Sequence, residues 1–173
     1  MQRLVVLMLT VLGVMAPDGS IAGDADAKSR AMIDRYVGTW AIAEFLEEPA
    51  IRGELRALLG DRLSELENSL SVSGGIEYFG GALAIRGNAP HSGGEQEGIV
   101  CVQVWGTNVE VHAALFSKGD VTVYTRQPRY AYLSTCVKDW IALVSTGHAY
   151  RLSRPPNVHL ESRPREEQTT SSE

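Results

Sequence analysis

The spacing of apolar residues changes along the chain and separates helical parts from extended ones. Over residues 48–70, apolar side chains such as Ile51 and Leu55 recur every three or four positions, which is the period of a helix with one buried face. Pro49 is typical of the first turn of a helix, and Gly60 of the position just after its end. This part therefore predicts two consecutive helices with a break at Gly60.

Further along, the period falls to two, which indicates strands. Short turns such as Gly80-Gly81 separate the apolar runs, so consecutive strands should pair antiparallel. The predicted strands cover residues 76–79, 82–86, 98–105, 109–116 and 121–125. Helical spacing also predicts a short helix over residues 41–47 and a longer one over residues 133–144. The pattern predicts an α+β fold, a five-stranded antiparallel sheet with helices packed on one face.

The two ends of the chain differ from this central part. Arg3 precedes an apolar run over residues 4–15, and Ser20-Ile21-Ala22 places small residues where a signal peptidase cleaves. The run is too short for a bilayer core of about 30 Å, so a signal peptide is predicted, with an uncleaved membrane anchor as the alternative. The expected division is a signal peptide (1–22), a flexible mature N-terminus (23–35), a folded domain (36–150) and a disordered, polar tail (151–173).

Charge and motif content argue against several classes of function. The chain has 173 residues and a net charge of −5, with no basic run interleaved with aromatic residues, so nucleic acid is not expected as a partner. Sequences of the GxSxG, HExxH and Walker types do not occur. The histidines are not at metal-ligand spacing, and His112 and His159 are expected to be solvated. We therefore expect a protein that is not an enzyme, has no metal or cofactor, and does not associate with a membrane after signal cleavage.

Two cysteines, Cys101 and Cys136, are present. In an exported chain an even number permits one disulfide, which here would join a predicted strand to a predicted helix. Two buried free thiols are the alternative, because sequence alone does not show that the two Cα atoms approach within about 7 Å.

The loop between the second and third predicted strands stands out by its composition. It reads Gly87-Asn88-Ala89-Pro90-His91-Ser92-Gly93-Gly94. Proline fixes one backbone angle and glycine permits left-handed conformations, so the loop is suited to project from the sheet. Its one side chain capable of acid–base chemistry is His91, which could donate a hydrogen bond to a carboxylate. A preorganised loop of this kind suits insertion into a cleft of a partner.

The loop and the strands around it resemble the inhibitor of vertebrate lysozyme family. The family's mark is a loop of the pattern Cys-x-Pro-His-x-Cys after a strand, closed by a disulfide, and Pro90-His91 stand at its Pro-His. The likeness covers roughly residues 36–144. Asn88 and Ser92 stand in place of the two loop cysteines, so the resemblance implies a divergent member that lacks the loop disulfide.

The resemblance implies a function and a partner. It implies an exported, periplasmic and non-catalytic protein whose histidine enters the active-site cleft of c-type lysozyme, hydrogen-bonds the catalytic carboxylates and so protects peptidoglycan. His91 would carry this role. The residues expected to shape the loop around it are Pro90, Gly87, Asn88, Ser92 and Gly93. The alternative is a divergent member that does not inhibit lysozyme and binds another periplasmic protein, and a homodimer is left open.

Overall fold

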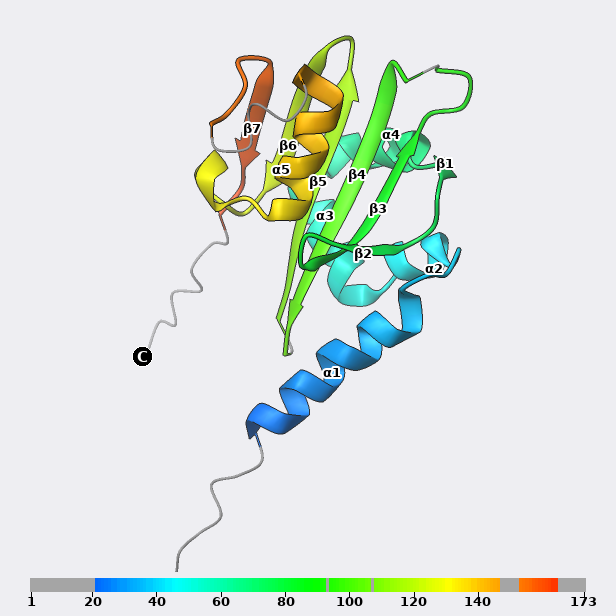
Figure 1. Cartoon of the computed structure of the whole chain (residues 1–173), viewed down its shortest axis with the longest axis vertical. Coiled ribbons are helices and arrows are strands. Elements are labelled where there is room, and N and C mark those ends of the chain that lie inside the picture. Colours follow the sequence, from blue (N-terminus) through cyan, green and yellow to red (C-terminus); the bar gives the residue numbers. More distant parts are fainter. Residues whose placement is uncertain (1–20, 93, 107, 147–152, 165–173) are drawn as a thin grey trace, which may run out of the picture.

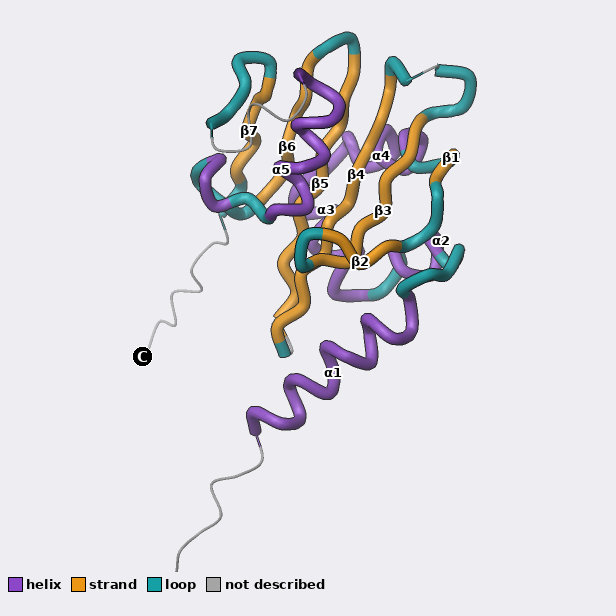
Figure 2. The backbone as a smooth tube through the Cα atoms, in the orientation of Figure 1, coloured by secondary structure: helices purple, strands orange, loops and turns teal. Residues whose placement is uncertain are grey.

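A mixed β-sheet forms the centre of the computed structural model, which describes residues 21–92, 94–106, 108–146 and 153–164. Within these residues the sheet has seven strands in the order β1-β3-β4-β5-β6-β7, with β2 pairing to β3 (Figures 1 and 2). All pairs are antiparallel except β6 and β7, which run parallel. The fold is α+β as predicted, but the expectation of five antiparallel strands is wrong.

The described residues contain five α-helices and seven strands. The helices are α1 (Ile21–Tyr36), α2 (Ile42–Leu46), α3 (Pro49–Leu59) and α4 (Leu63–Ser69), then α5 (Thr135–Ile141). Shorter helical turns are η1 (Gly60–Arg62), η2 (Tyr130–Tyr132) and the π-helical η3 (Ala142–Thr146). The strands are β1 (Val72–Ser73), β2 (Glu77–Phe79), β3 (Ala82–Asn88), β4 (Gln96–Trp105), β5 (Asn108–Ser117), β6 (Asp120–Thr125) and β7 (Val158–Ser162).

The five predicted strands are present, and tight turns join β2 to β3 and β5 to β6. Phe79 pairs with Ala82 around Gly80-Gly81, and Ser117 pairs with Asp120 at the β5–β6 turn. Gly80 has a positive φ of 58°, and a Cβ there would lie 2.6 Å from the backbone nitrogen of Cys136. Glycine at this turn therefore allows the β2–β3 hairpin to lie against the start of α5.

Helices cover both faces of the sheet, not one. Figure 1 shows α5 in front of the strands and α3 and α4 behind them. The prediction failed because β4 contains the unbroken apolar run Ile99-Val100-Cys101-Val102, which buries side chains on both faces. Val100 and Val102 join the core under α3 and α4, whereas Ile99 and Cys101 join the core under α5.

The disulfide left open by the sequence is present. Cys101 of β4 and Cys136 of α5 are bonded, with their Cα atoms 6.2 Å apart, and both residues are fully buried. The bond therefore fastens α5 to the sheet and lies in the second core rather than in the His91 loop.

Two segments that were expected to be flexible or disordered contain regular structure. Residues 21–36 form α1, although residues 23–35 were predicted to be flexible. Tyr36, at the end of α1, is buried; its hydroxyl group donates to the carboxylate of Glu48, and burial followed by this bond raises its pKa to about 12. Within the predicted tail, β7 pairs with β6, because Val158 and Leu160 supply apolar side chains to the core under α5.

The apolar run over residues 4–15 lies outside the described residues, and so do most of the predicted signal peptide and His148. Among the helices that are described, none is both long and apolar enough to cross a membrane.

Candidate partner-binding site

The His91 loop projects from one end of the sheet, where β3 passes into β4 (Figures 1 and 2). The last pair between these strands joins Asn88 to Glu97. One step further, the backbone N–H of Ala89 donates to the carbonyl oxygen of Gln96 at 3.0 Å, and Ala89 is buried. The base of the loop is thus continuous with the hydrogen-bonded sheet, which fixes its direction.

A tight turn presents His91 at its apex. The N–H of Ser92 donates to the carbonyl oxygen of Ala89 at 3.3 Å, which closes a four-residue turn with Pro90 and His91 at its centre. Proline in the second position and the positive φ of 60° at His91 are the features of a type II turn. Glycine usually occupies the third position of such a turn, and histidine adopts a positive φ more readily than most residues. Pro90 and His91 are both exposed to solvent.

Asn88 and Ser92 hold this turn without a covalent bond. The Nδ2 amide of Asn88 and the hydroxyl group of Ser92 both reach the carbonyl oxygen of Ala89, at 3.3 Å and 2.7 Å. The Ser92 hydroxyl also lies 3.3 Å from the carbonyl oxygen of Gln96. We name this arrangement of Asn88, Ala89 and Ser92 the polar clasp. In it, the Ser92 hydroxyl group and the Asn88 side-chain amide are both donors to the backbone.

Gly87 permits β1 to approach the base of the loop closely. A Cβ at this position would lie 2.7 Å from the carbonyl oxygen of Val72 and 3.1 Å from the Cα of Leu70. Any larger residue would push β1 away from β3. Gly93, also expected to shape the loop, lies outside the described residues.

A groove of about 530 Å³ runs alongside the loop. Its floor is formed by β3 and β4, and one wall by the end of α5 and by η3. Residues that line it include Arg86, Asn88, Glu97, Trp140, Leu143 and Val144. Leu143 is 52% exposed, so the groove has an apolar rim. The disulfide at Cys136 lies one helical turn before Trp140 and therefore supports this wall.

Charge in the groove is unevenly compensated. Arg86 pairs with Glu77 at 3.1 Å on the surface. Glu97 is half-buried, and burial raises its pKa above the ordinary value. No ion pair to Glu97 occurs among the residues that the structure describes. A positively charged group entering the groove would therefore gain a carboxylate partner.

Sequence reasoning missed Glu97, although a signal for it exists. Side chains alternate between the two faces of a strand, so Glu97 shares a face with Ile99 and Cys101, both of which are buried. A carboxylate at the end of such a series lies at the margin of a core rather than in open solvent.

His112 differs from its prediction. It was expected to be solvated on the polar face of a strand, but its side chain is fully buried. Its Nδ1 atom lies 2.8 Å from the hydroxyl oxygen of Thr125, and its Nε2 atom lies 3.5 Å from the Glu110 carboxylate.

The side chain of His159 is 61% exposed, as predicted. No group of three or more metal-ligating side chains occurs in the part of the chain that the structure covers.

Comparison with known proteins agrees with the resemblance seen in the sequence. The family model described as "Inhibitor of vertebrate lysozyme" matches residues 50–144, which is more than half of the chain. The matched segment runs from the start of α3 into η3 and contains the loop, the groove and both cysteines. Searches of curated proteins and of solved structures found no match.

Proposed function

The chain belongs to the family of inhibitors of vertebrate lysozyme, and from this premise we propose that it blocks a c-type lysozyme by inserting the His91 loop into the active-site cleft. The observation that carries the proposal is the presentation of His91. It is exposed at the apex of a turn that is held by two backbone bonds and by the polar clasp. Such a loop loses little conformational entropy when it docks.

The proposed mechanism is competitive and non-catalytic. The imidazole of His91 donates a hydrogen bond to the catalytic carboxylates of the lysozyme, and the turn around Pro90 fills the space that the substrate would occupy. A hydrogen bond to a charged acceptor is stronger than a neutral one, contributing about 1.5–3 kcal/mol. The groove beside the loop adds the Glu97 carboxylate as a partner for a basic side chain on the rim of the cleft.

Export is part of the proposal. We propose that residues 1–22 direct the chain to the periplasm, where it protects peptidoglycan from lysozyme that enters from outside. The disulfide between Cys101 and Cys136 supports this location, because such bonds persist in oxidising compartments and are rare in the cytosol.

The test is a titration of the chain from Gly23 onward against a c-type lysozyme in a cell-wall lysis assay. We expect competitive inhibition, and we expect His91→Ala to weaken it by at least about tenfold, which corresponds to about 1.4 kcal/mol. The matched control is His159→Ala, which removes an exposed histidine from β7 and should leave inhibition unchanged. If His91→Ala inhibits as well as the unmodified chain, the loop mechanism is wrong.

One observation favours a second function. Asn88 and Ser92 stand where the family pattern has cysteines. The loop is therefore closed by hydrogen bonds, which each contribute less to stability than a disulfide. A member that has lost lysozyme inhibition would use the same loop on another periplasmic protein. The immobilised chain would then leave lysozyme active, yet retain a protein from periplasmic extract that the His91→Ala variant does not retain.

A further inference from the structure

A second cavity lies at the opposite end of the sheet from the His91 loop. The loop precedes Gln96, the first residue of β4, whereas the cavity is lined by Trp105, the last residue of that strand. It has a volume of about 340 Å³, within the range of sites for small molecules. Its polar and aromatic lining residues are Trp105, Asn108, Glu110, Glu54, Arg126 and Gln127, and Val109 and Pro164 complete the lining. None of its lining residues belongs to the His91 loop, so it is separate from the site described above.

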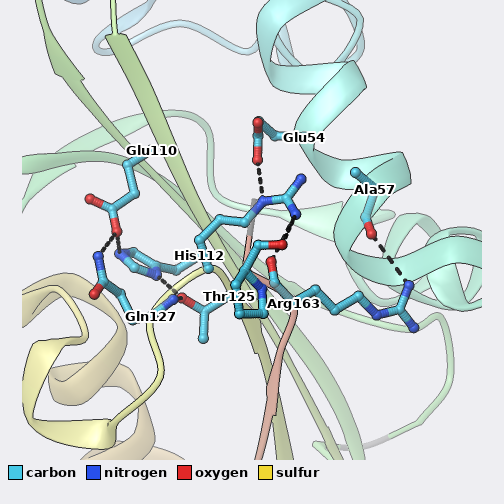
Figure 3. Close-up of polar contacts among 9 residues, drawn as sticks. Glu54, Ala57, Glu110, His112, Thr125, Gln127 and Arg163 are labelled. Carbon is cyan, nitrogen blue, oxygen red and sulfur yellow. Dashed lines mark hydrogen bonds and ion pairs between the residues drawn. The ribbon is translucent and has the colours of Figure 1, made fainter. Parts of the chain in front are cut away.

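The polar groups of this cavity are planar and are held in place. Gln127 donates its side-chain amide to Oε1 of Glu110. Arg126 donates from Nε to Oε2 of Glu54 at 3.0 Å and from Nη1 to the carbonyl oxygen of Arg163 at 2.7 Å (Figure 3). An amide, two carboxylates and a guanidinium group are therefore fixed before any ligand arrives, which reduces the entropy lost on binding.

The buried His112 lies next to Glu110 (Figure 3). The hydroxyl group of Thr125 accepts the backbone N–H of Gln127 at 3.0 Å and lies 2.8 Å from Nδ1 of His112. The other ring nitrogen, Nε2, lies 3.5 Å from Oε1 of Glu110 and makes no hydrogen bond to it. Gln127 and His112 both contact the Oε1 atom of Glu110. The Oε2 atom of Glu110 is therefore available to accept a hydrogen bond from a ligand.

Trp105 adds an exposed aromatic surface next to these groups. It pairs with Asn108 at the β4–β5 turn and is 54% exposed. Because side chains alternate along both strands, Trp105 lies on the same sheet face as Glu110, diagonally across the pair. An indole ring with one free face packs against flat C–H surfaces through dispersion.

We propose that this cavity binds a saccharide. The C–H face of a pyranose ring would stack on Trp105, while its hydroxyl or N-acetyl groups would exchange hydrogen bonds with Asn108, Glu110 and Gln127. An anion would be repelled by Glu110, and an apolar ligand would leave the fixed polar groups without partners. Arg126 and Glu54 offset each other's charge, so the Glu110 carboxylate and the amides of Asn108 and Gln127 are the groups to which a ligand rich in hydroxyl groups would bond.

The experiment is a calorimetric titration of the unmodified chain with three probes: the N-acetylglucosamine trimer, the maltose-series trimer and the cellulose-series trimer. We expect at least one to bind, and we expect Trp105→Ala to weaken that binding at least about tenfold, which is about 1.4 kcal/mol. Asn108→Ala, a smaller change at an exposed position, should weaken it in the same direction. The control is Trp40→Ala, which removes another exposed indole that lines a different cavity.

Several results would overturn the proposal. These are no binding of any of the three sugars, binding that Trp105→Ala and Asn108→Ala leave unchanged, or equal loss in Trp40→Ala. Binding of arginine ethyl ester that depends on Trp105, in the absence of sugar binding, would identify a cation site instead. The His91→Ala variant should bind the sugar normally, so the outcome is independent of lysozyme inhibition.

Discussion

The hydroxyl group of Ser92 lies 2.7 Å from the carbonyl oxygen of Ala89 and closes the turn that presents His91. The side-chain amide of Asn88, the last residue of β3, donates to the same oxygen. Asn88 and Ser92 stand where the family pattern has two cysteines joined by a disulfide. In this chain both side chains are instead hydrogen-bonded to one atom, the carbonyl oxygen of Ala89. Hydrogen bonds of this kind each contribute about 1 kcal/mol.

The first prediction is that the double variant Asn88→Cys/Ser92→Cys will form a disulfide and inhibit lysozyme more strongly. The two side chains already reach one atom, the carbonyl oxygen of Ala89, and the family pattern has its loop disulfide between these two positions. Closing so short a loop restricts the unfolded chain by about 2 kcal/mol and limits the conformations of the free loop. Mass spectrometry with and without reductant measures the bond, and the lysis assay measures inhibition.

The matched control for this variant is Asn88→Ala/Ser92→Ala, which removes the polar clasp without adding a bond. It should inhibit more weakly than the unmodified chain. If the cysteine variant forms its disulfide and yet inhibits no better, the hydrogen-bonded loop is already as well ordered as the lysozyme cleft requires.

The second prediction separates the imidazole of His91 from its backbone. At a φ of 60°, glycine is free of the steric cost that alanine incurs, which is about 1 kcal/mol. His91→Gly should therefore be more stable than His91→Ala by about this amount in thermal unfolding. Both variants lack the imidazole, so both should lose inhibition to a similar degree. Inhibition retained by His91→Gly alone would show that the turn, and not the side chain, blocks the lysozyme.

Much of this site follows from the sequence because its determinants are local. Pro90 and the glycines around it predict a projecting turn, and the Gly80-Gly81 turn predicts a hairpin, since both depend on the backbone preferences of neighbouring residues. The position of α5 does not follow in this way. It depends on which face of β4 has room for another helix, and the run Ile99-Val100-Cys101-Val102 is apolar on both faces.

Long-range pairing explains the other differences. The strand β7 has only a few apolar residues, and its place beside β6 depends on a parallel pairing across the chain between Val121 and Val158. His112 lies in an alternating strand and resembles a solvent-facing residue until the register places it opposite Cys101 and beneath α5. Contacts of this kind have no signature in a window of neighbouring residues.

The third prediction concerns Glu97. Burial raises its pKa, so its ionised form reduces the stability of the folded chain at neutral pH. The contribution of Glu97 to the free energy of unfolding is largest below the pKa that it has in the unfolded chain. That contribution is lost as the pH rises through its pKa in the folded chain. Glu97→Gln should therefore be at least as stable as the unmodified chain at pH 7, yet inhibit lysozyme roughly fivefold less well because a basic side chain loses its partner.

The control for Glu97→Gln is Glu161→Gln, an exposed residue of β7, because it changes the net charge by the same amount. It should leave inhibition unchanged at moderate salt. Equal weakening in both variants would mean that overall charge, rather than the groove beside the loop, guides the partner.

The last prediction is a loss of stability in mild acid that arises from His112. Burial lowers the pKa of His112, Lys138 lowers it further, and Glu110 opposes this. The unfolded chain therefore binds a proton on this histidine at a higher pH than the folded chain does. The free energy of unfolding should fall as the pH decreases from about 6.5 toward the folded pKa, by at most about 1.4 kcal/mol per pH unit. Urea unfolding at pH 7.5, 6.5 and 5.5 measures the effect.

The variant His112→Gln, which can still bond to Thr125, should flatten the dependence of the unfolding free energy on pH. The control His159→Gln, at an exposed site, should leave that dependence unchanged. A chain as stable at pH 5.5 as at pH 7.5 would mean that His112 accepts a proton without leaving its place beside Glu110.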